Sequence, residues 1–395
     1  MTAKTLLLVL CAPAAATICL LPSRMLVATV TDSAAPNFDQ VAIPVGKGPG
    51  PIAIADVNHD KKLDILVASS GSEKLTVLLG DGKGHFTPAP GAACSTGRGP
   101  NDIAVADFNG DGNPDVIIAN TGTPYLSVLL GDGKGGFKPA PHSPFDTQSH
   151  PHTHGLAAAD FNGDGKIDAV TDNWGNNQII LLLGDGRGNL VVPGKRFDVG
   201  KRPYQRLRSA DFNHDGKPDV VTTNLDGNNV SILLGDGKGG FHQPQGSPFP
   251  AGAAPWAVAI DDLNDDGNLD LAILPYDRDI APGLVGVTVL LGDGKGGFST
   301  LQGSPFLLPG CRGPDRIATG DFHGDNHRDI VVSCAQSNSL VLFMRAKDGS
   351  FQSSTIALKD IGWSGLAVSD LNSDGKDDIV VSNNSSGTVT ALLSR

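Results

Sequence analysis

Residues 107–115 read Asp-Phe-Asn-Gly-Asp-Gly-Asn-Pro-Asp. Oxygen-bearing side chains stand at the first, third, fifth and ninth positions of this stretch, and a glycine stands at the sixth. Acceptors on alternate residues, together with a turn-forming glycine, are the layout of a loop that wraps around one hard cation. The seventh residue adds its backbone carbonyl. The stretch therefore predicts a Ca²⁺-binding loop.

The same pattern occurs seven times along the chain, and five copies read Asp-x-Asn-x-Asp-Gly-x-x-Asp without exception. The copy that begins at Asp56 has Lys61 in place of the glycine. The copy that begins at Asp321 has His323 at the third position and Asn326 at the sixth, so it departs furthest from the pattern. We expect about five to seven Ca²⁺ sites. The predicted ligands, with some seventh residues included for their carbonyl groups, are Asp56, Asn58, Asp60, Asp64, Asp107, Asn109, Asp111, Asn113, Asp115, Asp160, Asn162, Asp164, Lys166, Asp168, Asp211, Asn213, Asp215, Lys217, Asp219, Asp262, Asn264, Asp266, Asn268, Asp270, Asp321, Asp325, Asp329, Asp370, Asn372, Asp374, Lys376 and Asp378.

The loops begin 49 to 59 residues apart, and a period near fifty indicates an array of small repeated units. In the clearest unit, apolar runs at 103–106, 116–119 and 126–130 predict three strands, the first of them buried on both faces. The glycine-rich turn at 131–136 leads to a short fourth strand that opens at Phe137. No unit carries a helical pattern. The sequence predicts an all-β, seven-bladed β-propeller with four-stranded antiparallel blades.

The two ends of the repeat region divide one unit between them. The last unit stops after its third strand at Arg395, and residues 38–43 match a fourth strand with nothing before it. We therefore expect the N-terminal strand to complete the last blade. The predicted propeller domain covers residues 36–395.

Residues 1–35 have the pattern of an export signal. Lys4 precedes a largely apolar run over residues 5–22, which Arg24 follows. The alternative is an anchoring segment that is not cleaved, and it would be the chain's one contact with a membrane. Either way we expect a secreted, periplasmic or cell-surface protein, where weak calcium sites are filled at millimolar Ca²⁺.

The acidic charge of the chain comes mainly from the predicted loops. The formal net charge is −12, and 21 of the 42 acidic residues are loop aspartates. A full set of seven Ca²⁺ ions would more than neutralise that charge. The acidity is therefore a metal-binding feature, and we expect no nucleic-acid partner.

The stretches IAVADFNGDGNPD (103–115) and LSVLLGDGKGGF (126–137) resemble the FG-GAP or VCBS repeats of bacterial secreted proteins and of the integrin α-subunit propeller. The resemblance covers roughly residues 38 to 395. It implies a calcium-binding propeller that acts as a binding or adhesion module, possibly a lectin-like one, and we expect it to be monomeric.

Strand direction predicts two different faces. The aspartate loops and the glycine-rich turns should share one face, here called the lower face, and the remaining connections should lie on the opposite, upper face. Residues five to seven places before each loop should ring the upper mouth of the central channel, where aromatic, amide and charged groups could bind a glycan or a protein. A water-lined funnel without a ligand is the alternative. The candidate ligand-binding residues are Asp102, His154, Tyr204, Gln205, Arg206, Trp256, Asp315, Arg316 and Trp363.

Two smaller clusters also suggest sites. His150, His152 and His154 would share one side of an extended segment and could bind Zn²⁺ or Cu²⁺, or they could form a solvated loop. Cys311 and Cys334 should both lie at the upper end of the sixth blade, where they could form a disulfide or remain free thiols.

Three functions remain open on the sequence alone. The first is a ligand-binding or adhesion module. The second is an extracellular carbohydrate-active enzyme, a polysaccharide lyase or hydrolase, that uses the upper funnel. The third is a structural scaffold for protein contacts. No nucleophile motif or recognised catalytic spacing supports an enzyme, so we predict no catalytic residues.

Overall fold

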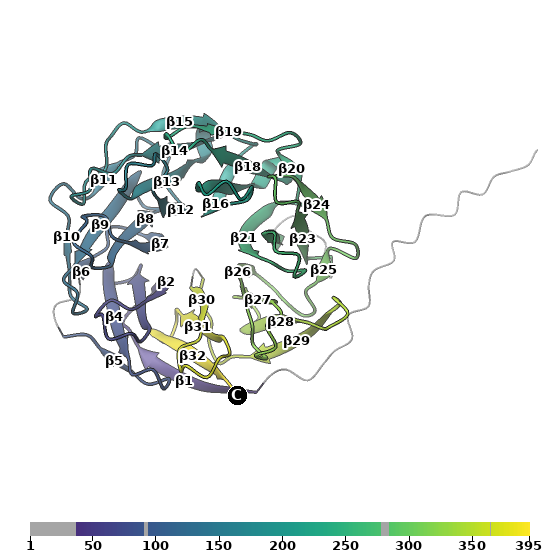
Figure 1. Cartoon of the computed structure of the whole chain (residues 1–395). Coiled ribbons are helices and arrows are strands. Elements are labelled where there is room, and N and C mark those ends of the chain that lie inside the picture. Colours follow the sequence, from purple (N-terminus) through teal and green to yellow (C-terminus); the bar gives the residue numbers. More distant parts are fainter. Residues whose placement is uncertain (1–36, 91–93, 278–283, 364) are drawn as a thin grey trace, which may run out of the picture.

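The computed structural model describes residues 37–90, 94–277, 284–363 and 365–395. Seven antiparallel sheets surround a central opening, and each sheet has a main path of four strands (Figure 1). This arrangement confirms the predicted seven-bladed propeller. The predicted export segment and most of the long connection after Tyr276 lie outside the described residues.

The blades follow one another around the ring in chain order, each running from the innermost to the outermost strand. Blades one and two consist of β2 (Pro49–Ala55), β3 (Asp64–Ser69), β4 (Lys74–Gly80) and β5 (Phe86–Pro88), then β7 (Pro100–Ala106), β8 (Asp115–Asn120), β9 (Tyr125–Gly131) and β10 (Phe137–Pro139). Blades three and four consist of β12 (Leu156–Ala159), β13 (Asp168–Asn173), β14 (Gln178–Leu182) and β15 (Lys195–Asp198), then β16 (Pro203–Ala210), β17 (Asp219–Asn224), β18 (Asn229–Gly235) and β19 (Phe241–His242). Blades five and six consist of β21 (Pro255–Asp261), β22 (Asp270–Pro275), β23 (Gly286–Gly292) and β24 (Phe298–Thr300), then β26 (Pro314–Gly320), β27 (Asp329–Cys334), β28 (Ser339–Arg345) and β29 (Phe351–Ala357).

Blade seven contains strands from both parts of the chain. Its inner three strands are β30 (Leu366–Ser369), β31 (Asp378–Asn383) and β32 (Thr388–Ser394). Its outer strand is β1 (Phe38–Pro44), which pairs antiparallel with β32. The first described strand therefore joins the last blade.

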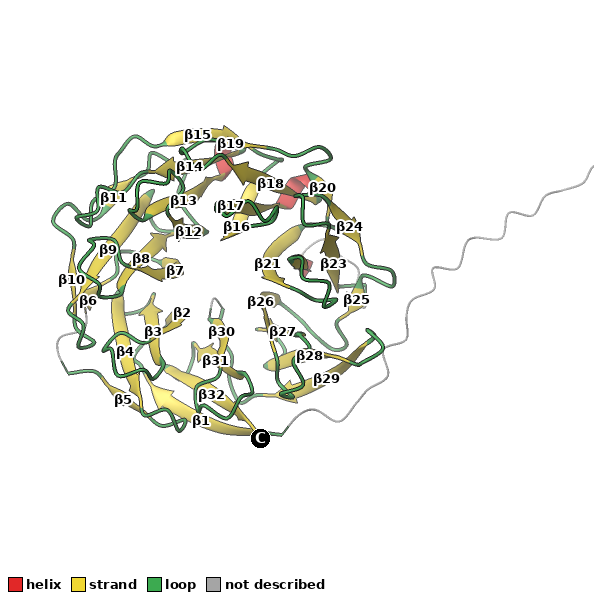
Figure 2. Ribbon diagram, viewed as in Figure 1, coloured by secondary structure: helices red, strands yellow, loops and turns green. Residues whose placement is uncertain are grey.

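A few short elements extend the four-stranded pattern. Four two-residue strands pair with the third strands of their blades, namely β6 (Cys94–Ser95), β11 (Phe145–Asp146), β20 (Phe249–Pro250) and β25 (Phe306–Leu307). Figure 2 shows strands and loops almost throughout. The 3₁₀ turns η1 (Trp174–Asn176) and η2 (Leu225–Gly227) were not indicated by the sequence, and Asp277 is also in 3₁₀ conformation. None of the described helices is long and apolar enough to cross a membrane.

Apolar side chains fill the junction between each pair of neighbouring blades. Each of the seven clusters is centred on two adjacent blades, and the one between blades five and six also includes Leu225 of blade four. At the junction of blade seven with blade one, Val380 and Val389 pack with Ile52 and Ile65. The second strands, such as β8, are buried along their whole length, because each is covered by a blade on both sides. The innermost strands differ from the prediction. The second half of β7 is only half-buried, because it lines the central opening.

Candidate functional site

The seven aspartate loops are closed by their own first residue. In the loop after β7, Asp107 Oδ1 accepts the backbone N–H groups of Asn109 (3.2 Å) and Gly110 (2.7 Å). Asp107 Oδ2 accepts the N–H of Gly112 at 2.9 Å. The glycine has a φ of 85°, which explains the preference for glycine at the sixth position. In the first loop Lys61 adopts the same left-handed conformation (φ 66°) and donates its N–H to Asp56 at 2.8 Å, so the loop keeps its shape without the glycine.

The ninth aspartate of each loop is fully buried and joins three parts of its blade. Asp115 Oδ2 accepts the N–H of Phe108 at 2.9 Å, and Oδ1 accepts the N–H of Gly131 at 2.7 Å. Equivalent pairs of bonds occur in the other six loops. This carboxylate therefore ties the loop and the start of the second strand to the end of the third. Sequence reasoning assigned it only to metal binding.

The electrostatics of the loops suit a cation. Burial, together with the charges of Asp111 and Asp107, raises the pKa of Asp115 to about 6, although two backbone N–H groups oppose the shift. The pKa of the ninth aspartate is likewise raised in the other six loops, to about 7 for Asp329. Three carboxylates crowded on one loop are the donor set that Ca²⁺ prefers, and a cation would relieve their mutual repulsion.

The sixth loop, which departs furthest from the pattern, lies among cationic side chains. Its His327 contacts Asp265 of the fifth loop at 2.9 Å, and Arg345 also pairs with Asp265. Arg328 bridges Asp261 (3.4 Å) and Asp377 (3.1 Å) of the blades on either side. At this loop, the basic side chains of His327, Arg328 and Arg345 connect neighbouring blades.

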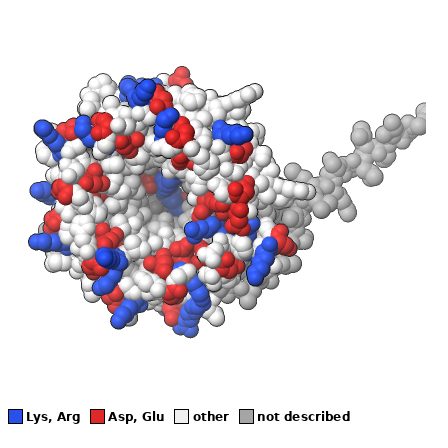
Figure 3. Space-filling view, in the orientation of Figure 1, with Lys and Arg blue, Asp and Glu red and all other residues white. Residues whose placement is uncertain are grey.

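A charged cluster fills the central channel. Asp102 of blade two pairs with Arg206 (3.0 Å) and Arg208 (2.8 Å), both of blade four. Arg316 of blade six pairs with Asp315 at 2.7 Å. Figure 3 shows Lys or Arg side chains inside the central opening, with Asp or Glu nearby. Four of the predicted funnel residues, Asp102, Arg206, Asp315 and Arg316, therefore meet within the channel and are almost fully buried.

Other predicted residues form an aromatic cluster at the upper ends of blades three to five. His154 packs on Tyr204 with ring centroids 4.0 Å apart, and Tyr204 lies 5.4 Å from Trp256. Trp256 is 8% exposed and stacks on Tyr276 at 4.4 Å. Trp174 lies 5.2 Å from Tyr204. These rings are packed mainly against one another.

The histidine segment contributes two of its three rings to one contact. His152 Nε2 lies 3.2 Å from His154 Nε2, and His154 Nδ1 lies 3.3 Å from Asp172 Oδ2. His150 is exposed, and its backbone N–H bonds to Asn173. The remaining predicted residue of this region, Gln205, is buried and accepts a hydrogen bond from Asn101 at 3.1 Å.

Trp363 lies apart from both clusters. Its side chain is 40% exposed and lines an open depression of about 780 Å³ between blades six and seven. The other lining residues are mainly polar, namely Ala335, Asn338, Lys359, Asp360, Ile361, Gly362, Asn384, Ser385 and Ser386. Of the predicted aromatic residues, Trp363 has the most exposed side chain against the part of the chain that the structure describes.

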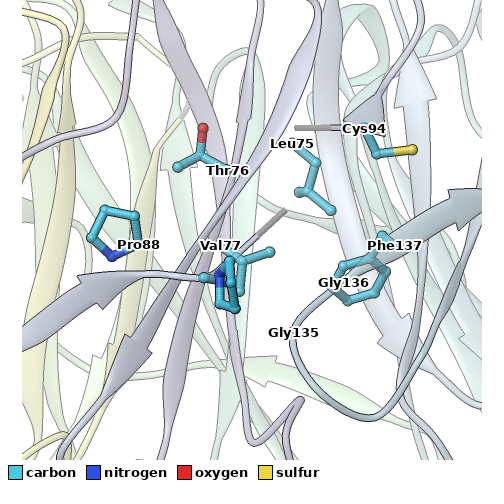
Figure 4. Close-up of a pocket in the computed structure, with 10 residues that line it drawn as sticks. Leu75, Thr76, Val77, Pro88, Cys94, Gly135, Gly136 and Phe137 are labelled. Carbon is cyan, nitrogen blue, oxygen red and sulfur yellow. The ribbon is translucent and has the colours of Figure 1, made fainter. Parts of the chain in front are cut away.

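The cysteines occupy different parts of the ring. Cys311 and Cys334 form a disulfide with a Cα–Cα distance of 5.3 Å. Cys94 is a free thiol at the outer edge of blades one and two, where it lines an apolar cavity of about 200 Å³ with Leu75, Val77 and Phe137 (Figure 4). Burial raises the pKa of the Cys94 thiol. Among the described residues, the lining of the cavity contains no set of polar groups that would orient a ligand.

Several site residues were not predicted from the sequence. Trp174 and Tyr276 each immediately follow the second strand of a blade. Because the connection after a second strand lies on the upper face, this position in the repeat would have placed both residues there. Arg208 stands three residues before its loop, two residues closer than the nearest predicted position, although it reaches the same channel. Arg202 lies over the rings of Trp174 and Tyr204, and no local pattern distinguishes it.

Solved structures of the same overall shape have different functions. A virginiamycin B lyase from Staphylococcus aureus superposes with a TM-score of 0.55 at 13% identity, covering 90% of this chain and 99% of that one. A lectin from Agrocybe aegerita, described as recognising non-reducing terminal N-acetylglucosamine, gives a TM-score of 0.54 at 16% identity, covering 90% and 97%. At these identities the likeness shows the fold alone.

Sequence comparisons identify the repeat. Cartilage acidic protein 1 of Mus musculus is 27% identical over 134 residues, which are 33% of this chain and 20% of that protein, so the chain spans about a fifth of that relative. The family described as FG-GAP-like repeat matches residues 56–118, 107–171, 211–273 and 321–381, which together make up more than half of the chain. With its seven repeated blades and their aspartate loops, this chain belongs to the FG-GAP-like repeat family.

Proposed function

We propose that this protein is an exported, calcium-stabilised binding module that takes a glycan in the depression beside Trp363. The observation that carries the proposal is the exposure of Trp363, at 40%, next to a polar hollow of about 780 Å³. An exposed indole ring offers the flat apolar surface on which a sugar ring stacks, and its polar neighbours can bond the hydroxyl groups.

The residues around Trp363 supply both donors and acceptors. Asn338 and Asn384 offer amide groups, Ser385 a hydroxyl, and Asp360 and Lys359 charged groups. Such a mixed set suits a neutral or weakly charged polyhydroxyl compound better than an apolar ligand. The depression is also wide enough for one or two sugar units, because ligand sites in proteins commonly measure about 300–1,000 Å³.

The calcium part of the proposal rests on the loops of the lower face. Their carboxylates are clustered, and the pKa of the buried ninth aspartate is raised, so bound Ca²⁺ would stabilise the folded chain. The loops in which Asp107 and Asp262 are the first residues keep the full ligand pattern. Export fits this role, because extracellular calcium fills weak sites. The lectin of similar shape supports only that such a fold can carry a glycan site.

A glycan array with the calcium-loaded protein tests the proposal, and Trp363→Ala is the decisive variant. We expect selective binding by the wild type and its loss in Trp363→Ala. Trp174→Ala is the matched control, since it removes the same ring from the upper face of another blade. Equal loss in both variants, or unchanged binding in Trp363→Ala, would place the site elsewhere.

The enzymatic alternative depends on the contact of His152 with His154 and Asp172, which could move a proton. Product analysis of each bound glycan by mass spectrometry separates the two functions. We expect intact glycan. Release of unsaturated or shortened products that is abolished in His154→Ala would show an enzyme instead.

A further inference from the structure

Among the described residues, three arginines and two aspartates meet in the central channel. Arg206 and Arg316 are buried with Asp102 and Asp315, and the partly exposed Arg208 gives this described cluster one excess positive charge. The side chains of Arg206 and Arg316 are 3% and 6% exposed, far from the water that normally solvates a guanidinium group. Desolvation of these two guanidinium groups is costly, and an anion beside them would offset part of that cost.

The carboxylate of Asp102 has little capacity left. Its Oδ2 accepts the N–H of Leu156 (3.2 Å) and a donor of Arg208, and its Oδ1 accepts the N–H of Ile103 (3.2 Å) and forms an ion pair with Arg206. Arg206 Nη1 also donates to the backbone carbonyl of Asn101 at 3.2 Å. Arg206 Nε, in contrast, is buried without a hydrogen-bond partner among the described residues.

A small cavity lies where these groups meet. It measures about 60 Å³ and is lined by Asp102, Arg206, Arg208 and Arg316, with apolar side chains such as Ile103 completing its walls. A single water needs about 10–15 Å³ measured in this way, so the cavity has room for a small anion. Apolar walls also strengthen the attraction between the guanidinium groups and an anion.

The cavity is connected to a wider space on the side of the aspartate loops. That space, of about 350 Å³, shares Arg208, Val258, Ile317 and Leu366 with the cavity and is further lined by residues closer to the loops. The side chain of Arg208 is 38% exposed at this connection. An anion therefore has a route from the lower mouth of the channel.

We propose that the cavity at Arg206 is a binding site for a small monovalent oxyanion, such as formate, acetate or bicarbonate. One negative charge balances the cluster, and a planar oxyanion matches the fork of guanidinium donors. Burial and the neighbouring charge of Arg316 lower the pKa of Arg206 to about 9, because both disfavour the charged guanidinium. The site is separate from the glycan depression, so the two proposals stand or fall independently.

Titration of the calcium-loaded protein with ¹³C-labelled formate, followed by NMR at constant ionic strength, tests the site. We expect saturable binding of one formate per chain, competed by acetate. Because a charge-assisted hydrogen bond is removed, Arg206→Gln should bind about tenfold more weakly or worse. Arg187→Gln, on an exposed hairpin turn outside the channel, should bind as the wild type does.

Formate could also bind at the calcium loops, but that binding would be independent of Arg206. Should Arg206→Gln fail to fold, Arg208→Gln replaces it, since its partly exposed side chain is easier to substitute. Non-saturable binding by the wild type would overturn the proposal. Formate binding with wild-type affinity in a folded Arg206→Gln or Arg208→Gln variant would also overturn it.

Discussion

At the scale of single residues, the packing of each aspartate loop depends on the second and the ninth residue of the loop. The second residue of every loop is a large apolar side chain with 1% to 3% exposure, as in Val57, Phe108 and Phe161. Phe108 starts from the loop of blade two and packs among residues of blades two and three. The ninth aspartate fixes the backbone of this apolar residue by accepting its N–H. Each loop therefore joins two blades, whether or not it holds a cation.

Phe108→Ala should lower the free energy of unfolding by about 3–5 kcal/mol, because it leaves a cavity at a blade junction. Urea denaturation followed by tryptophan fluorescence measures the change. Val191→Ala, at a side chain that is 55% exposed, is the control and should change stability by about 0.5 kcal/mol or less. A loss below about 1 kcal/mol in Phe108→Ala would contradict the assigned role of this ring.

The raised pKa of the ninth aspartates predicts how the calcium-free protein responds to pH. Asp115 has an ordinary pKa of 3.8 and a folded pKa of about 6, so between these values the folded state binds more protons than the unfolded state. Its contribution to stability therefore decreases as the pH rises from about 4 to about 6, and for Asp329 to about 7. Bound Ca²⁺ should reverse this trend, because it requires the ionised carboxylates.

Urea denaturation of calcium-depleted protein across this pH range measures the trend. Asp115→Asn provides the comparison, since it removes one titrating group while keeping a side chain of similar size. The variant should show a shallower decrease of stability with pH than the wild type. An identical slope in both proteins would show that Asp115 does not titrate in this range.

At the scale of elements, blade six combines a disulfide with ion pairs to a neighbouring blade. Its loop departs from the calcium pattern, while Arg345 and His327 bind Asp265 of the preceding blade. The disulfide between Cys311 and Cys334 joins the approach to β26 to the end of β27, across a sequence separation of 23 residues. Covalent and ionic contacts thus hold together the blade whose loop departs furthest from the calcium pattern.

Removal of this disulfide by the double change Cys311→Ala and Cys334→Ala should lower the free energy of unfolding by about 3 kcal/mol, because a loop of this length gains entropy in the unfolded chain. Denaturation under non-reducing conditions measures the loss. Cys94→Ala, which removes the free thiol, is the control and should have a much smaller effect. Equal stabilities of the double variant and the control would show that the disulfide does not stabilise blade six.

At the scale of the whole molecule, seven similar junctions hold the ring closed. The junction of blade seven with blade one is an apolar cluster like the other six, and β1 lies along β32 from Phe38 opposite Ser394 to Pro44 opposite Thr388. Because every blade depends on two neighbours, loss of stability at one junction should weaken the whole ring. We therefore expect cation binding at the aspartate loops, one at each junction, to affect a single unfolding transition.

Removal of calcium should lower the melting temperature of the whole protein by roughly 10 °C, because several weak sites each contribute about 1–2 kcal/mol at millimolar Ca²⁺. Differential scanning calorimetry with and without chelator measures the shift. Magnesium at the same concentration is the control for ionic strength. Coincident melting curves would show that the loops do not hold calcium under these conditions.

The repeat pattern was sufficient to predict the fold, whereas the upper face was predicted only in part. The loop at 107–115 and the strands around it were located correctly because they depend on local spacing, and the seven copies gave the number of blades. Trp256 and Trp363 occupy comparable positions before their loops, and the sequence could not tell them apart. The structure separates them, because Tyr276 covers Trp256 while nothing comparable covers Trp363 among the described residues.

The sequence by itself determined the architecture and the lower face, since a strand, its turn and its aspartate loop are each encoded within about ten consecutive residues. The tertiary structure alone decided the chemistry of the channel. Asp102, Arg206 and Arg316 belong to blades two, four and six, and they meet only because ring closure brings three distant strands to one axis. Such contacts depend on the geometry of the complete ring, which no local pattern in the chain records.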